Sequence, residues 1–517
     1  MAAPSIPVPR APDDTTPGPP LQGTDLWLVA VLGLLLGVAI GLGVGNTLLV
    51  VGVVGVFGLV FVLARPEWVV TVYVVLIYAN LLSILSDYHG LPPVARFAGA
   101  LVLFAVFAYR LIARRLPLVG DELTWWLLVY GFVLALGLGY ARNPGAVVSN
   151  LIEFARNFIT FLVILNTVNT RARLQFILWG LLLMGTILAS LTVYQTVTGR
   201  FDQDFGGLAQ YHVSEISGGT DAPRPSGTLG DANYYGQLLI IVLPIALYFL
   251  FRKRSTGLTR LIGLGTAGIL AAGTVFTYSR GDGLALIALG ICALIFLRPR
   301  LSHLLALVVL GVLVFPLVPS NYVERMSTIL QTAQNSSSTI YTDRSLEGRL
   351  GTALAAVYIF LDHPILGVGR ENYTLYELDY ISGTALAYQN KSIPPHDLYL
   401  EVAAEQGIIG ILAFTALLLA TGRALREAWR RFRAVGDDDG ASLAAWLAIG
   451  LIAYLVSGLF LHGAYLYVLW LQIALIAALR QIARNETPAL AISGRDTLRP
   501  PPRSFWSRLR RSGAAAG

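Results

Sequence analysis

The sequence has very few residues of the kinds that build disulfides, thiolate metal sites or water-facing surfaces. Cys292 is the only cysteine among 517 residues and lies inside an apolar run, so disulfides, zinc–cysteine sites and a cysteine nucleophile can be set aside. Charged residues make up only 13% of the chain, whereas soluble globular proteins carry about 25%. Most of the protein surface must therefore face something other than water.

Other absences narrow the range of functions. The sequence contains no Walker-type glycine loop, which argues against ATP hydrolysis by this chain. The only acidic run, Asp437–Asp439, is flanked by glycines, and we expect it to form a solvated turn on the cytoplasmic side. We therefore expect no metal site for chemistry on the opposite side and no cofactor. Basic residues occur mainly in short gaps between apolar runs, a pattern of membrane orientation rather than of nucleic-acid binding.

Apolar runs, in contrast, follow one another almost from end to end. Hydrophobic residues make up 55% of the chain, and many runs reach the roughly 20 residues that cross a bilayer as a helix. This pattern predicts an all-α, polytopic transmembrane helix bundle with a large helical loop outside the membrane. We predict fourteen spans, at roughly 26–43, 46–64, 68–86, 97–113, 123–141, 150–169, 174–198, 233–251, 259–278, 282–297, 302–318, 408–425, 442–461 and 463–481.

The positive charges fall in alternate gaps between these spans. The basic groups are Arg65, then Arg110, Arg114 and Arg115, then Arg171 and Arg173, then Arg252, Lys253 and Arg254, then Arg298 and Arg300, and finally Arg423, Arg426, Arg430, Arg431 and Arg433. Because positively charged loops stay in the cytoplasm, this alternation predicts cytoplasmic termini and an inner (plasma) membrane protein that works on its extracytoplasmic face.

The predicted organisation follows from this topology. It consists of a disordered cytoplasmic tail (1–24), eleven spans with an external loop at 199–232 (25–318), a large extracytoplasmic loop (319–407), three final spans (408–484) and a basic cytoplasmic tail (485–517). Long loops in a compact protein tend to be functional. Within the largest loop, Leu350, Leu354, Val357 and Leu361 recur at helical spacing, which predicts an amphipathic helix against the membrane or the bundle.

His396 stands out among the six histidines because of its local setting. Two prolines before it favour an extended chain, Asp397 is a plausible N-cap, and Gly407 is expected to end the short helix that follows. A neutral imidazole held at the water–membrane boundary can take a proton from a sugar hydroxyl. We therefore predict that His396 is a general base.

Four motifs in fixed order resemble the O-antigen ligase/polymerase family of bacteria. They are Gly227–Asn233, then Ser279-Arg280-Gly281, then Gly348-Arg349 followed by Asp362–Gly369, and finally His396-Asp397 followed by Gly407-Ile-Ile-Gly410. The resemblance covers about residues 220–480. At Asp397 the family more often has an amide or a hydroxyl, a difference that bears on the choice of acceptor.

The resemblance implies a metal-independent glycosyltransferase whose donor glycan is carried on undecaprenyl pyrophosphate. Guanidinium groups can stabilise the leaving pyrophosphate without a metal. The expected pyrophosphate-binding residues are Arg280 and Arg349, with Arg224, Arg344 and Arg370 as further candidates. The expected supporting residues are Asp397, Ser279, Asn233, Glu401, Gly407 and Gly410.

Several alternatives remain open from the sequence. A ligase would move finished glycan onto lipid A-core or another hydroxyl acceptor, whereas a polymerase would extend a growing glycan. A transporter or flippase of lipid-linked glycan would share the helix count, although polar residues gathered in one-sided external loops favour an enzyme. Glu153 and Arg156, inside an apolar run, form an internal ion pair or line the donor cavity.

Overall fold

The computed structural model of the chain describes residues 66–90, 119–217, 220–297, 344–381, 393–463 and 466–487, with a few positions between 305 and 312. The predicted spans 26–43, 46–64 and 97–113 and both predicted tails fall outside the described residues, except for the start of the C-terminal tail, and 302–318 is described only at those few positions. The other predicted spans fall on helices.

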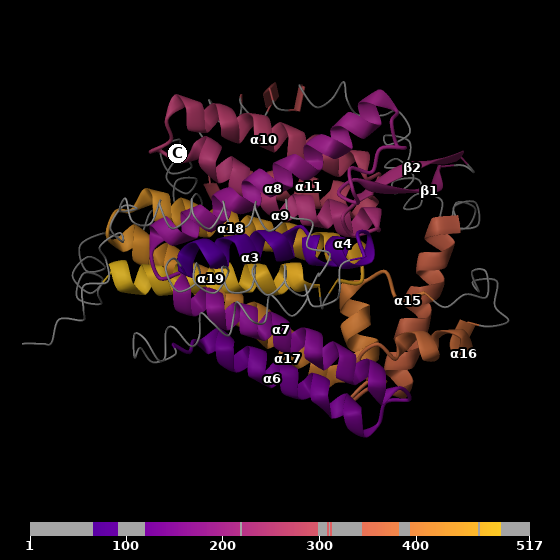
Figure 1. Cartoon of the computed structure of the whole chain (residues 1–517). Helices are drawn as coiled ribbons and strands as arrows, with labels where there is room; N and C mark the ends of the chain where they lie inside the picture. Colours follow the sequence, from indigo (N-terminus) through magenta and orange to yellow (C-terminus); the bar gives the residue numbers. More distant parts are fainter. Residues whose placement is uncertain are drawn as a thin grey trace, which may run out of the picture.

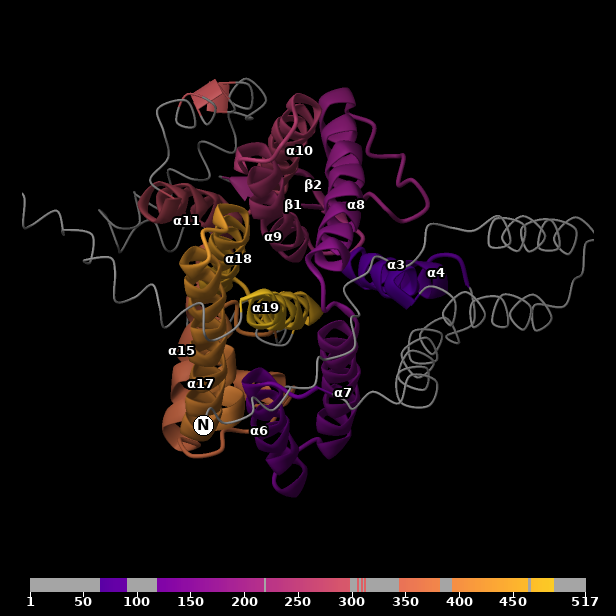
Figure 2. The same cartoon turned by 90° about the vertical axis from the view of Figure 1, so that its left-hand side faces the viewer.

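The described residues form a mainly helical bundle, in which eight helices are long and apolar enough to cross a membrane (Figure 1). They are α6 (Glu122–Leu136), α7 (Pro144–Thr167), α8 (Arg171–Thr198), α9 (Ala232–Phe251), α10 (Gly257–Phe276), α17 (Leu398–Ala434), α18 (Asp438–Ser457) and α19 (Tyr467–Glu486). A further helix, α11 (Arg280–Leu297), packs against α18. Figure 2 shows α19 near the middle of the bundle, between α18 and α7.

The predicted span 68–86 is a bent pair of helices rather than one rod. Helices α3 (Pro66–Tyr78) and α4 (Leu81–Asp87) meet at an angle of 62°. The break falls at Asn80, whose backbone is left-handed (φ 52°), a conformation that asparagine tolerates better than most residues. The Asn80 side chain donates a hydrogen bond to the carbonyl of Thr228 (3.0 Å), which ties the break to the turn before α9.

At one end of the bundle, acidic and basic side chains form a network of ion pairs. Arg480 is almost completely buried and pairs with Asp121 and Glu122 at the start of α6. Asp437 accepts a hydrogen bond from the Gly440 amide (3.1 Å), which caps α18, and also pairs with Arg171. The expectation of a solvated turn at Asp437–Asp439 is therefore wrong, because these carboxylates join the start of α18 to α8 and to the loop after α9.

The opposite end carries the only β-structure in the described part of the chain. Strands β1 (Gln210–Ser217) and β2 (Thr220–Gly227) pair as an antiparallel hairpin within the loop between α8 and α9. The all-α prediction thus omits one small element. Pro223 and Pro225 argue against a strand in the sequence, because proline cannot donate a hydrogen bond to a neighbouring strand. They are tolerated here because each strand of a two-stranded ribbon has a free edge.

A helical layer crosses the same end of the bundle. Helix α15 (Arg344–Asp362) runs roughly across the direction of the long helices and is followed by the 3₁₀ turn η4 (Tyr373–Leu375) and α16 (Glu377–Ile381) (Figure 1). The predicted amphipathic helix is thus confirmed as a helix. Its buried face is formed by Thr352, Ala355, Ala356 and Ile359, and the apolar residues Leu350, Val357 and Leu361 are exposed.

Candidate functional site

Three helices begin at the end of the bundle that carries the hairpin, and each start coincides with a motif from the sequence. Asp231 caps α9 by accepting from the amides of Asn233 (2.8 Å) and Tyr234 (3.1 Å). Asp397 caps α17 by accepting from the amides of Tyr399 and Leu400 (2.8 Å each), as predicted. Ser279 precedes α11, and its carbonyl accepts the first helical bond, from Gly283 (3.1 Å).

His396 lies immediately before the cap of α17, in a buried position. Its ring contacts the ring of His462 edge to face, with centroids 5.4 Å apart. Burial, together with the positive charge of Arg349, lowers the pKa of His396 from 6.5 to about 4, and Asp231 opposes the shift. The imidazole is therefore neutral at neutral pH and has Arg349 and Asp231 within electrostatic range.

His462, which the sequence analysis did not single out, reaches the site from the loop between α18 and α19. Its carbonyl accepts a hydrogen bond from the hydroxyl of Tyr234 (2.5 Å), and the Tyr234 ring lies against its imidazole with centroids 5.2 Å apart. Burial lowers the pKa of His462 to about 3. The Nδ1 atoms of His396 and His462 are buried and have no hydrogen-bond partner among the described residues.

Arg224 reaches the site from strand β2. Its Nε donates to the Thr277 carbonyl (3.0 Å), and its Nη2 donates to Oδ1 of Asn233 (3.1 Å). Burial lowers the pKa of Arg224 to about 10, Asp231 and Asp282 oppose this shift, and the nearby charge of Arg280 adds to it. Arg224 and Arg280 are thus neighbouring cations with carboxylates close by.

Arg280 is the first residue of α11 and is itself buried. The turn before it is held in an unusual shape, because Tyr278 adopts a left-handed backbone (φ 55°) and the Ser279 amide donates to Oγ1 of Thr277 (3.3 Å). A guanidinium group at the start of a helix adds its charge to the partial positive charge of the helix end. This arrangement suits an anionic group of the substrate.

Asp282, in the first turn of α11, is fully buried beside these cations. Its Oδ1 accepts a hydrogen bond from the Ser457 hydroxyl (2.6 Å), and its Oδ2 has no hydrogen-bond partner in the part of the chain that the structure describes. A Cβ atom at Gly236 would lie 2.1 Å from Oδ2, so glycine is needed there for this approach. Asp282 was not predictable from the motifs, because it lies just past the motif that contains Arg280.

Arg349 lies on α15 and approaches His396 from the loop layer; its charge contributes to the low pKa of that histidine. Arg344 begins the same helix, but its side chain lies outside the described set. The structure therefore brings Arg349 to the site and leaves the predicted role of Arg344 untested.

Arg370 is held in a cluster of carboxylates. Its Nη1 contacts Glu405 (2.9 Å) and Glu401 (3.2 Å), and its Nη2 contacts Glu371 (2.8 Å). The cluster lies near His462, since the charge of Arg370 adds to the lowering of the pKa of His462. Glu401 thus contacts Arg370, which links the loop after α15 to the first turns of α17.

The glycines of the last two motifs allow a close backbone crossing. Gly407 kinks α17 with φ 61°, and a Cβ there would lie 2.5 Å from the carbonyl carbon of Ile365. Gly367 crosses the same helix with φ 67°, and its Cβ would lie 2.3 Å from the backbone of Glu405. Gly410 leaves room for the Gln406 side chain. These glycines hold the loop after α15 against the helix that begins beside His396.

The ion pair between Glu153 and Arg156 is present on α7, with a separation of 3.6 Å, but both side chains are exposed rather than internal. Glu153 also lines a narrow crevice of about 260 Å³ of empty space together with Asn150, Asn157 and Arg370. The predicted ion pair is thus present but not internal, and the role of Glu153 in lining a donor cavity stays a prediction.

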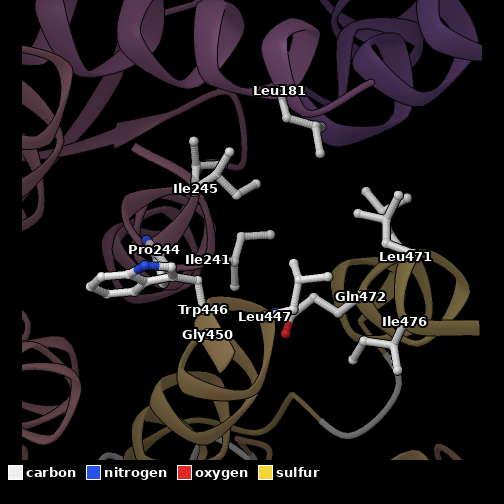
Figure 3. Close-up of a pocket in the computed structure, with 12 residues that line it drawn as sticks. Leu181, Ile241, Pro244, Ile245, Trp446, Leu447, Gly450, Leu471, Gln472 and Ile476 are labelled. Atoms are coloured by element: carbon white, nitrogen blue, oxygen red, sulfur yellow. The ribbon is translucent and has the colours of Figure 1, made fainter. Parts of the chain in front are cut away.

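An apolar cavity lies deeper in the bundle, between α8, α9, α18 and α19 (Figure 3). Its empty volume is about 400 Å³, and Leu181, Pro244, Trp446 and Gln472 are among the residues that line it. The described residues that line this cavity include no histidine, arginine or carboxylate, so the cavity does not share the chemistry of the site around His396. Among the described residues, no group of three or more His, Cys, Asp or Glu side chains is arranged to hold a metal ion.

The structure thus places Asp231 within electrostatic range of His396 and Arg224, with Arg349 near His396 and Arg280 near Arg224. Together these features describe a multi-pass membrane protein with a buried site of histidine and arginine side chains at one end of its helical bundle.

A family model described as O-Antigen ligase matches residues 265–415. The matched stretch contains three of the four motifs, with Arg280, Arg349 and His396, and it confirms the resemblance to the O-antigen ligase/polymerase family. Among curated proteins, none matches this chain.

Proposed function

We propose that this protein is a glycosyltransferase that moves glycan from undecaprenyl pyrophosphate to an acceptor hydroxyl on the extracytoplasmic face of the membrane. The observation that carries the proposal is the meeting of a neutral, buried imidazole with arginines from separate elements: Arg349 next to His396, and Arg224 next to Arg280. The family match supports a ligase or polymerase of lipid-linked glycans.

The arginines stabilise the pyrophosphate leaving group. As the bond from the anomeric carbon to the pyrophosphate oxygen breaks, both bonding electrons remain on that oxygen and negative charge develops there. Arg280 and Arg349 stabilise this charge with their guanidinium groups, and Arg224 supports Arg280 from the hairpin. A metal ion is not needed for this step.

His396 activates the acceptor hydroxyl. The acceptor hydroxyl attacks the anomeric carbon, and its proton passes to the imidazole of His396 as the new glycosidic bond forms. A pKa of about 4 makes His396 a weak base in the empty site. A bound pyrophosphate places negative charge near Arg349 and raises this pKa, so that His396 becomes an effective base only when the donor is present.

The orientation in the membrane follows from the charge distribution. The ion-pair network of Arg171, Lys253, Arg480 and their partners lies at the end of the bundle opposite to His396. Since basic residues mark the cytoplasmic side, the site faces outward and both termini lie in the cytoplasm. The donor lipid and the acceptor, which is a glycan or lipid A-core, meet at this outer face.

The glycan pattern of cells that carry His396→Ala tests the proposal and separates its two forms. Loss of a ligase leaves long lipid-linked polymers without a final acceptor, whereas loss of a polymerase leaves single lipid-linked repeats. His89→Ala is the matched control, because His89 lies at the same end of the bundle, where its Nε2 donates a hydrogen bond to the Gly206 carbonyl (2.9 Å) and its ring contacts the ring of Tyr88. Wild-type glycan in the His396→Ala strain, at normal protein level, would refute both forms.

A further inference from the structure

Helix α15 has two faces of different character. Thr352, Ala355, Ala356 and Ile359 are buried, and the Tyr373 hydroxyl donates to the Thr352 carbonyl (2.7 Å), which fixes this face to η4. Ala355, Ala356 and Ile359 share a small core with Ala404 of α17. One side of α15 is therefore packed on protein.

The opposite side of α15 is apolar and uncovered. At about 100° per residue, Leu350, Val357, Tyr358 and Leu361 are centred roughly 180° from the buried residues. Tyr358 is 49% exposed and Leu361 is 61% exposed. Arg349 lies beside the buried face rather than on this apolar side, in agreement with its approach to His396.

The exposed side continues directly into the membrane-facing stripe of α17. Ile365, which is 63% exposed, follows α15 by three residues, and its carbonyl accepts from the Ile409 amide (3.3 Å). Next to it begins a stripe of exposed apolar residues on α17, namely Ile408, Leu412 and Leu419. The spacing of these residues keeps them on one face of a helix that is long and apolar enough to span a bilayer.

We infer that the apolar ridge formed by Leu350, Val357, Tyr358, Leu361 and Ile365 rests in the outer leaflet of the bilayer, so that α15 is an interfacial helix and not a water-exposed loop element. Helix α15 crosses the direction of the long helices, as a helix in the membrane plane does (Figure 1). The occupant of the ridge is lipid, because its five residues are apolar or aromatic and the ridge is continuous with the stripe of exposed apolar residues on α17.

This placement gives Arg349 a defined depth. The packed face of α15 directs Arg349 toward His396, while the ridge anchors the helix at the boundary between hydrocarbon and headgroups. Arg349 is then held at the level where the phosphates of a lipid carrier leave the bilayer. This consequence rests on the proposed function, whereas the membrane contact of the ridge does not.

Lipid contact can be measured directly, because Cys292→Ser gives a cysteine-free chain. Single cysteines at Val357 or Leu361 are labelled with bimane in protein reconstituted into nanodiscs whose acyl chains are brominated. Leu412→Cys on α17 serves as the lipid-facing control and Asp202→Cys, in the exposed loop after α8, as the water-facing control. We expect the labels at Val357 and Leu361 to be quenched as strongly as the label at Leu412.

Two outcomes overturn the inference. Quenching of the ridge labels by aqueous iodide, as at Asp202, would place α15 in water. Protection from both iodide and brominated lipid would show that another segment of the protein covers the ridge. Neither quenching measurement depends on glycan transfer, so failure of this inference and failure of the proposed function are distinguishable.

A functional readout links the ridge to Arg349. Because Leu361→Glu replaces an apolar contact with a charge that the hydrocarbon region disfavours, it is expected to lower kcat/KM for a lipid-linked donor about tenfold or more. Leu361→Met keeps the apolar contact and is expected to retain activity. Equal activity of the two variants at equal protein level would contradict a role of the ridge in placing Arg349.

Discussion

The pH dependence of glycan transfer tests the environment of His396 more sharply than removal of its imidazole by substitution. The pKa of His396 lies at about 4 instead of 6.5, because burial and Arg349 disfavour the imidazolium. At about 1.36 kcal/mol per pH unit, this difference corresponds to roughly 3 kcal/mol against protonation. The base form therefore persists to much lower pH than an ordinary histidine would allow.

The direction in which pH changes the activity follows from the role of the His396 imidazole. Only neutral His396 can accept a proton, so activity is present above its pKa and is lost as the pH falls through that value. The ratio kcat/KM reports the free enzyme and is expected to stay level down to about pH 5, then to fall below about pH 4. The acid limb of kcat is expected at higher pH, since the bound pyrophosphate raises the pKa of His396.

The assay is glycan transfer by the reconstituted protein over a pH series, with a thermal unfolding scan at each pH to separate loss of activity from loss of fold. Arg349→Gln removes a positive charge and should move the limb of kcat/KM to higher pH. Asp231→Asn removes a negative charge while keeping a good helix cap, and should move the limb lower. A limb of kcat/KM at or above pH 6.5, or one that neither variant moves, would refute this account of His396.

Three further outcomes are expected. Arg280→Ala should lower kcat about 10²–10³-fold, and Arg280→Lys should recover only part of this, because a point charge replaces a planar fork; full activity of the lysine variant would contradict the leaving-group role. Gly407→Ala places a Cβ 2.5 Å from the Ile365 backbone at φ 61° and should cost about 2–3 kcal/mol of stability in thermal unfolding, whereas Gly422→Ala, with nothing within 4 Å, should be neutral or stabilising. Glycan transfer should continue in excess EDTA, and loss that Mg²⁺ restores would count against an arginine-based mechanism.

Local features of the site were predictable because they depend on residues close together in the chain. Two prolines, a capping carboxylate and a glycine nine residues beyond Leu398 predict a helix that starts at Leu398 and ends at Gly407; the start is present, and at Gly407 the helix is interrupted by a kink and then continues. The apolar spacing from Leu350 to Leu361 predicts the helix that carries Arg349. The spacing could not tell which side is buried, because small residues such as Ala355 form the packed face.

Contacts between distant segments were not predictable from one sequence. The ring of His462 contacts the ring of His396 edge to face across 66 positions of the chain, and the sequence of its loop resembles that of an ordinary turn between two spans. The hairpin that brings in Arg224 contains two prolines, which argue against a strand unless it has a free edge. Asn80 breaks a run whose apolar composition alone predicts an unbroken span.

Transfer by the purified protein is the most direct test of the central claim. The protein is reconstituted in liposomes with a glycan on undecaprenyl pyrophosphate and a hydroxyl acceptor, and the release of lipid pyrophosphate is followed together with the new glycoside. We predict that both products form in equal amounts with the wild-type protein and that neither forms with His396→Ala, although that variant is folded. Equal product from the two proteins, or movement of the donor across the membrane without any transfer, would contradict the claim.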